Sequence, residues 1–185
     1  MMYWFLVPLL SGFICNLGSA FTTAISRRWG KHRGSIITVI LRDVLGIPVW
    51  TIGFFLAAQS PSPLLFTSTL ATVMGWLLVT LGGGIILVAL LTIRLPAARP
   101  SIKDQLVQTG IYARVRHPIH TGVLLEFAGL AMINPTLPIA LASGMGMEWV
   151  FLQTWFEEID LLERLPGYRD YMNTVPRFLP RFRIK

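Results

Sequence analysis

The sequence predicts an all-α integral-membrane protein, a bundle of five transmembrane helices. Of its 185 residues, 54% are hydrophobic and only 14% are charged, and the mean hydropathy is +0.62. A typical soluble domain carries about 25% charged residues, so this composition indicates a protein that lies in lipid. At this length we expect a single membrane domain over residues 1–185. The one cysteine, Cys15, excludes an internal disulfide.

The positions of the basic residues predict how the bundle is oriented. Fifteen of the sixteen lie in three polar stretches, at 27–33, 94–116 and 164–185. The N-terminus and the short turns at 60–63 and 134–138 have none. Because basic residues are enriched on the cytoplasmic side, we expect the N-terminus outside and the C-terminus in the cytosol. The compact length and the lack of organelle signals favour a prokaryotic inner membrane.

The charges also bear on partners. The net charge is +7, but it is spread along one membrane face, which argues against nucleic-acid binding. The sixteenth basic residue, Arg42, lies inside an apolar stretch beside Asp43. We expect these two to form a local or interhelical ion pair rather than a catalytic one.

Apolar stretches predict the five spans, at about residues 2–25, 36–59, 64–94, 118–134 and 139–156. The first lacks the basic start of a cleaved signal peptide, so we expect it to be a retained helix. The last two are joined by a short turn and should form an antiparallel hairpin with both ends in the cytosol. Glycines 82–84 predict close helix packing, since a phosphate-binding loop would need a preceding strand. From Asp160 onward the tail predicts a cytosolic amphipathic helix and then an extended segment.

Titratable residues gather where the two arms of this hairpin should meet. His117 and His120 begin one arm, and Glu157 and Glu158 end the other, forty residues after His117. Because an ionisable residue beside a span marks a functional site by default, we expect a small-molecule site here. The two histidines and Glu157 would also suit a metal ion, but the histidine spacing is not that of zincins and no further ligand is evident. No metal is predicted.

Two more carboxylates lie within the arms. Glu126 follows His117 by nine residues, and Glu148 precedes Glu157 by nine. Burying a carboxylate in lipid costs about 2.5 kcal/mol or more, so each should face the bundle interior or a wet cavity. Either would then serve as a proton acceptor, or as a neutral acid in an interhelical hydrogen bond.

The residues around the hairpin resemble a known family. Residues 106–122, Leu-Val-Gln-Thr-Gly-Ile-Tyr-Ala-Arg-Val-Arg-His-Pro-Ile-His-Thr-Gly, are similar to the signature of isoprenylcysteine carboxyl methyltransferases and their phospholipid methyltransferase relatives. The Asn134-Pro135 turn, the Glu157-Glu158 pair and the tail at 167–177 resemble the same family, and the likeness covers about residues 100–182. It implies an integral-membrane enzyme that uses S-adenosylmethionine, with the cofactor region at 104–185.

The resemblance also implies which residues contact the cofactor: Gln105, Leu106, Val107, Tyr112, His117, Pro118, Ile119, His120 and Glu157. The chain departs from the family at His120, where Tyr is usual, and at Ile111, where Pro or a small residue is common. Carboxyl methyltransferases of the family have an Arg four residues before the first Glu, and here that residue is Gln153. We expect Gln153 to contact the substrate. The missing cation removes a charge-assisted hydrogen bond, which disfavours a carboxylate acceptor.

The predicted function is therefore methyl transfer from S-adenosylmethionine to a lipophilic amine, thiol or carboxylate that enters from the bilayer. The reaction depends mainly on positioning, and the candidate bases are Glu126 and Glu148. An acid at Glu126 would suit an amine or another neutral or cationic acceptor. Two alternatives stay open. One is an NADPH-dependent enzyme similar to membrane sterol reductases, and the other is a non-enzymatic membrane scaffold that binds no cofactor.

Overall fold

The computed structural model describes residues 3–93 and 106–180, and the regular elements of this part are all helical. The helices of the N-terminal half are α1 (Leu6–Ser19), α2 (Thr22–Trp29), α3 (Lys31–Val39), the π-helical segment η1 (Ile40–Gly46), α4 (Ile47–Gln59) and α5 (Thr69–Ile93). Those of the C-terminal half are the 3-10 turn η2 (Gly110–Ala113), α6 (Pro118–Ile133), α7 (Leu137–Arg164) and α8 (Tyr168–Thr174). The all-α class predicted from composition is confirmed.

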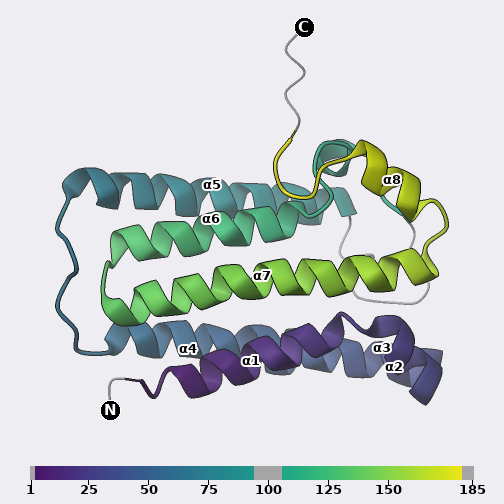
Figure 1. Cartoon of the computed structure of the whole chain (residues 1–185), viewed down its shortest axis with the longest axis horizontal. Coiled ribbons are helices and arrows are strands. Elements are labelled where there is room, and N and C mark those ends of the chain that lie inside the picture. The colour runs from purple at the N-terminus through teal and green to yellow at the C-terminus, as the bar shows by residue number, and fades with distance from the viewer. Residues whose placement is uncertain (1–2, 94–105, 181–185) are drawn as a thin grey trace, which may run out of the picture.

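The long helices run alongside one another as a bundle (Figure 1). The hairpin of α6 and α7 lies in the middle, with α5 packed on α6, and with α1 and α4 packed on the other side of α7. Helices α2, α3 and α8 gather at the end where α6 begins and α7 finishes (Figure 1). We call this the site end. The opposite end is closed by short turns, where Leu65 N–H donates to the carbonyl of Pro135 at 2.7 Å.

The number of spans differs from the prediction of five. Two helices are long and apolar enough to cross a membrane, Lys31–Gln59 and Thr69–Ile93. The bent pair α1 and α2 makes a third if it counts as one broken span. Helix α6 is apolar but has only 16 residues, about 24 Å at 1.5 Å per residue, which is short of a hydrocarbon core of about 30 Å. The described residues thus provide two to three candidate spans and one shorter apolar helix.

The first predicted span, residues 2–25, is not one continuous helix. Helices α1 and α2 meet at 71°, and the bend is stabilised from elsewhere in the chain. The backbone N–H of Thr23, in the first turn of α2, donates to Oδ1 of Asp160 at 2.7 Å. A carboxylate at a helix N-terminus satisfies N–H groups that have no partner in the helix and interacts well with the helix dipole. Local hydropathy gives no sign of a cap supplied by α7.

Other helix boundaries also differ from those of the predicted spans. The second predicted span starts earlier, at Lys31, and the third starts later, at Thr69, because residues before it pair with the turn between α6 and α7. Helix α7 is longer than the predicted 139–156 and runs on to Arg164, so part of the predicted tail helix belongs to it. The remainder is α8, which follows Gly167 in the left-handed conformation, with φ of 79°.

Glycines let α5 and α6 approach each other closely. A Cβ added at Gly82 would lie 2.6 Å from the carbonyl oxygen of Gly122, and one at Gly75 would lie 2.8 Å from that of Gly129. Small residues at this spacing allow the backbones of membrane helices to touch. The predicted packing role is confirmed for Gly82, but not for Gly84, where an added Cβ meets nothing within 4 Å.

This contact predicts the effect of a substitution. Gly82→Val should lower the melting temperature of the protein in detergent, because overpacking a close contact costs about 1–3 kcal/mol. Gly84→Val is the matched control on the same helix and should leave the melting temperature unchanged. The two variants are compared by thermal unfolding in the same micelle, and equal shifts would contradict this account.

Candidate functional site

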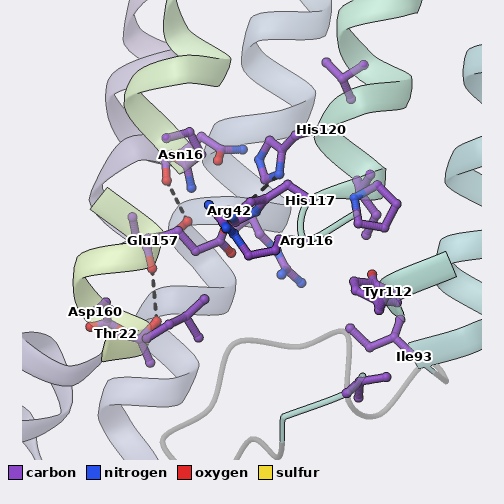
Figure 2. Close-up of a pocket in the computed structure, with 18 of the residues that line it drawn as sticks. Asn16, Thr22, Arg42, Ile93, Tyr112, Arg116, His117, His120, Glu157 and Asp160 are labelled. Atoms are coloured by element: carbon purple, nitrogen blue, oxygen red, sulfur yellow. Dashed lines mark hydrogen bonds and ion pairs between the residues drawn. The ribbon is translucent and has the colours of Figure 1, made fainter. Parts of the chain in front are cut away.

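A cavity of about 520 Å³ opens at the site end of the bundle. Helices α1, α2, α4, α5, α6, α7 and α8, the segment η1 and residues 106–112 all contribute to its wall (Figure 2). Cofactor and small-molecule sites typically have volumes of about 300–1,000 Å³. The aromatic core, in which Phe13 stacks on Trp149 and Phe54 on Phe127, adjoins the cavity, since Trp149 belongs to both.

The hairpin brings the predicted histidines and glutamate together. His117 immediately precedes α6, and its Nδ1 lies 3.6 Å from Oε2 of Glu157 on α7. Nδ1 of His120 lies 4.0 Å from the same oxygen. All three residues line the cavity (Figure 2). The short turn at Asn134 and Pro135 thus brings together two side chains that are forty residues apart in the sequence, as the predicted antiparallel hairpin required.

These three side chains are also close enough to share a metal ion, because their ligand atoms lie within 4.8 Å of one another. However, His117 is already engaged through its other nitrogen, Nε2, which lies 3.1 Å from Oε1 of Glu158. In the neutral ring that hydrogen bond places the proton on Nε2 and leaves a lone pair on Nδ1, facing the cavity.

Glu158 is the centre of a buried ion cluster. Arg116 donates to its Oε1 from Nε at 3.1 Å and from Nη2 at 2.9 Å, and Arg177 donates to both of its oxygens. Burial alone would raise the pKa of this carboxyl. The hydrogen bonds from His117 and Arg177 and the charge of Arg116 outweigh burial and hold the pKa at about 2. Glu158 is therefore an anion at neutral pH. Sequence reasoning identified the pair of glutamates. It did not predict that Glu158 would pair with the two arginines while Glu157 lines the cavity.

His117 and Tyr112 remain uncharged for reasons of burial. Burial lowers the pKa of His117, against the opposing hydrogen bond with Glu158. Burial also raises the pKa of Tyr112, and the negative charge of Glu157 raises it further. At neutral pH the cavity therefore presents a neutral imidazole and a phenol that keeps its proton.

The C-terminal tail fixes the signature segment in place. Backbone N–H groups of Arg116 and His117 donate to the carbonyls of Pro176 at 2.9 Å and Arg177 at 3.1 Å. Arg116 Nη1 donates to two more tail carbonyls, those of Met172 and Val175, at 2.7 and 2.6 Å. The tail thus covers the mouth of the hairpin and holds His117 at the cavity.

Most of the residues that sequence reasoning selected line the cavity: Leu106, Val107, Tyr112, His117, Pro118, Ile119, His120, Gln153 and Glu157. Gln105 lies outside the described residues. Sequence reasoning missed the lining residues of the N-terminal half, which include Asn16, Arg42, Asp43 and Trp50. Arg42 and Asp43 carried a usable signal, a charged pair within an apolar stretch, but it was interpreted only as an ion pair.

The two candidate bases are not among the residues that line this cavity, and their role as bases stays a prediction. Glu126 lies against α5, where a Cβ on Gly82 would meet its Cγ at 3.0 Å. Glu148 lines a separate apolar pocket between α1 and α7. The reason is helical periodicity. Nine residues are two and a half turns at 3.6 residues per turn, which puts Glu126 opposite His117 on α6 and Glu148 opposite Glu157 on α7.

Some polar atoms of the cavity wall have no partner within the described residues. Four lining residues have a buried polar side-chain atom without a hydrogen bond: Nε1 of Trp50, Nε1 of Trp149, Oε1 of Gln153 and Oε2 of Glu157. Buried polar atoms are nearly always paired. These two indole donors and two acceptor oxygens could therefore form hydrogen bonds with a ligand in the cavity.

Comparison with known proteins agrees with this site. A sequence model of the phospholipid methyltransferase family matches residues 70–165, which is 96 of the 185 residues. The match covers α5, the signature segment, the hairpin and the glutamate pair. The match begins and ends earlier in the chain than the resemblance of the signature and tail, which covers about residues 100–182. No curated protein and no solved structure matches the chain. The chain belongs to the phospholipid methyltransferase family and is a membrane methyltransferase that uses S-adenosylmethionine.

Proposed function

We propose that the enzyme methylates the amine head group of a phospholipid-type acceptor, and that the cavity holds the cofactor against His117 and Glu157. The observation that carries this proposal is the pair formed by Nδ1 of His117 and Oε2 of Glu157. These atoms lie 3.6 Å apart on the cavity wall, and Oε2 is buried with no hydrogen bond from any residue that the structure describes. Both accept hydrogen bonds when the histidine is neutral.

The donor set fits S-adenosylmethionine. A ribose presents two neighbouring hydroxyl groups, and each would donate to one of the two acceptors, His117 Nδ1 and Glu157 Oε2. Apolar and aromatic side chains beside them, Leu106, Val107 and Tyr112, suit the faces of an adenine ring. When bound, the cofactor supplies an electrophilic methyl group on a sulfonium. Carboxylate and aromatic surroundings favour such a cation.

The chain's own contribution is to bind, orient and exclude water. Arg116 and Arg177, which would repel a sulfonium, both pair with Glu158, whose single negative charge offsets one of their two positive charges. The tail hydrogen bonds keep His117 in position. Because methyl transfer is an in-line displacement, holding donor and acceptor in the correct geometry supplies most of the catalysis.

An amine acceptor follows from the residue at 153. Gln153 is buried and lines the cavity, and its Oε1 has no hydrogen-bond partner in the described part of the chain. A carboxylate substrate would meet this neutral amide in place of a cation, whereas an amine would donate to its oxygen. An acceptor with a lipid tail would reach the site from the bilayer, and the cofactor would enter from the cytosol.

The test is incubation of the purified protein in lipid nanodiscs with labelled S-adenosylmethionine and a total lipid extract. We expect label in an amine-bearing lipid whose mass has increased by one methylene, and saturable binding of the cofactor. A chelator should leave the rate unchanged, because displacement at the methyl carbon needs no Lewis acid. Failure to bind the labelled cofactor, together with binding of NADPH, would overturn the proposal in favour of a reductase.

A further inference from the structure

The cationic side chains at the cavity differ in how far they are exposed. Arg116 is committed to Glu158 and to two tail carbonyls. Arg164 is committed to Asp160 at 2.8 Å, and both side chains of that pair are only 7% exposed. The side chain of Arg42 is 26% exposed, and its partner Asp43 is 36% exposed. Arg42 is therefore the lining cation best placed to reach a ligand.

Arg42 and Asp43 are presented by the π-helical segment η1. Such segments are often found at functional sites. The segment packs tightly on α1, since a Cβ on Gly46 would lie 2.8 Å from Cβ of Asn16. Asp43 accepts hydrogen bonds from Nε of Arg42 at 2.7 Å and from Nη2 at 3.2 Å. This fork-like contact fixes the plane of the guanidinium at the cavity wall.

Two further hydrogen-bond donors line the cavity deeper in the bundle, eight residues after Arg42 and eight residues before Glu157 in the chain. The indoles of Trp50 and Trp149 adjoin each other, with ring centroids 6.1 Å apart, and neither N–H group has a hydrogen-bond partner among the residues that the structure describes. Trp149 is only 7% exposed, and its ring lies 6.3 Å from that of His120. A guanidinium and two indole N–H groups offer donors alone, which suits a ligand rich in acceptor oxygens.

The depth of Arg42 in the bundle matches that of a lipid phosphate. Seventeen residues separate it from Gln59 at the far end of α4, about 26 Å of helix. Glu157 is twenty residues from Leu137 at the far end of α7, about 30 Å. The hydrocarbon core is about 30 Å thick. With the far ends of α4 and α7 at one boundary of this core, Arg42 and Glu157 would lie close to the other boundary, where the phosphate of a phospholipid also lies.

We propose that Arg42 binds the phosphate of the acceptor lipid and that it selects phosphate-bearing amines over other lipophilic amines. The inference rests on the proposed function and adds its specificity-determining residue. Arg42 lies outside residues 70–165, which match the family. The N-terminal helices would thus supply the acceptor site, and the hairpin would supply the cofactor site.

The test measures acceptor preference in nanodiscs. The wild type and Arg42→Gln are assayed with two amines, a phosphatidylethanolamine and a long-chain amine that has no phosphate. For Arg42→Gln we expect KM for the phospholipid to rise about 10- to 100-fold, as for loss of a hydrogen bond between charged groups. KM for the long-chain amine and Kd for S-adenosylmethionine should change less than about twofold, and Arg42→Lys should recover part of the preference.

Two controls separate binding from folding. Arg28→Gln removes a cation from the exposed part of α2 and should leave the preference unchanged. The double variant Arg42→Gln with Asp43→Asn leaves no unpaired carboxylate and should lose the preference as the single variant does. If Arg42→Gln raises both KM values equally, or neither, Arg42 is only a structural partner of Asp43 and this proposal fails. If the wild type itself binds no S-adenosylmethionine, the proposed function fails instead.

Discussion

Replacing Glu158 with alanine should destabilise the protein by about 3–5 kcal/mol, the cost of leaving a buried ion cluster without its central partner. The side chain of Glu158 is 2% exposed, and that of Arg116 is 9% exposed. Without the carboxylate, Arg116 and Arg177 would be left facing each other with no anion between them. The tail that they hold to the hairpin should then detach. Thermal unfolding in detergent should show a large fall in melting temperature.

Glu163→Ala is the matched control for this substitution. Glu163 lies on the same helix and pairs with Arg27, but its side chain is 42% exposed, and exposed ion pairs contribute about 0–1 kcal/mol. A fall for Glu158→Ala no larger than that for Glu163→Ala would refute the central role of Glu158.

The acid limb of the stability profile gives a second measurement of the same cluster. The pKa of Glu158 is lowered in the folded protein to about 2, from an ordinary 4.5. A carboxyl with a lowered pKa stabilises the fold fully above its ordinary pKa, and this contribution is lost as pH falls toward the folded value. The wild type should therefore lose stability between about pH 4.5 and pH 2, and Glu158→Gln should show a flatter curve over that range.

Replacing Glu157 with alanine should instead weaken cofactor binding while leaving stability nearly unchanged. Its Oε2 has no hydrogen bond within residues 3–93 and 106–180, so loss of this oxygen breaks no hydrogen bond in the described part of the chain. A hydrogen bond to a charged group contributes about 1.5–3 kcal/mol, so Kd for S-adenosylmethionine should rise about 10- to 100-fold. Equilibrium binding of labelled cofactor and the melting temperature are measured on the same preparation.

Asp170→Ala, an exposed acid on α8, serves as the control for loss of negative charge and should leave Kd unchanged. The assignment of Glu157 to the cofactor would be wrong if its alanine variant bound S-adenosylmethionine as tightly as the wild type. It would also be wrong if that variant melted as early as Glu158→Ala.

These two predictions differ because consecutive residues on a helix point about 100° apart, at 3.6 residues per turn. On α7 that rotation directs Glu157 into the cavity and Glu158 toward the tail. His117 contacts both, with Nδ1 toward the first and Nε2 toward the second. The imidazole therefore links the tail to the wall of the cavity.

Several features of this protein followed from its sequence alone. Composition predicted an all-helical membrane protein, and the short turn at Asn134 and Pro135 between two apolar arms predicted that His117 would meet Glu157. Both inferences depend on local properties, namely hydropathy and the length of a connection. Glycines 82–84 predicted close packing for the same reason, although only the structure showed that Gly84 takes no part.

Tertiary structure decided the features that depend on how helices are rotated against one another. Asp160 on α7 caps the N-terminus of α2 at the bend in the first predicted span. No local sequence pattern predicts this contact, because Asp160 and α2 are far apart in the chain. Glu126 and Glu148 point away from the cavity, because their facing is set by the rotation of α6 and α7. Arg42 lines the cavity because η1, the segment that carries it, packs on α1. Hydropathy along a chain reports how deeply each residue lies in the membrane, whereas the direction of its side chain is fixed by the neighbours against which its helix packs.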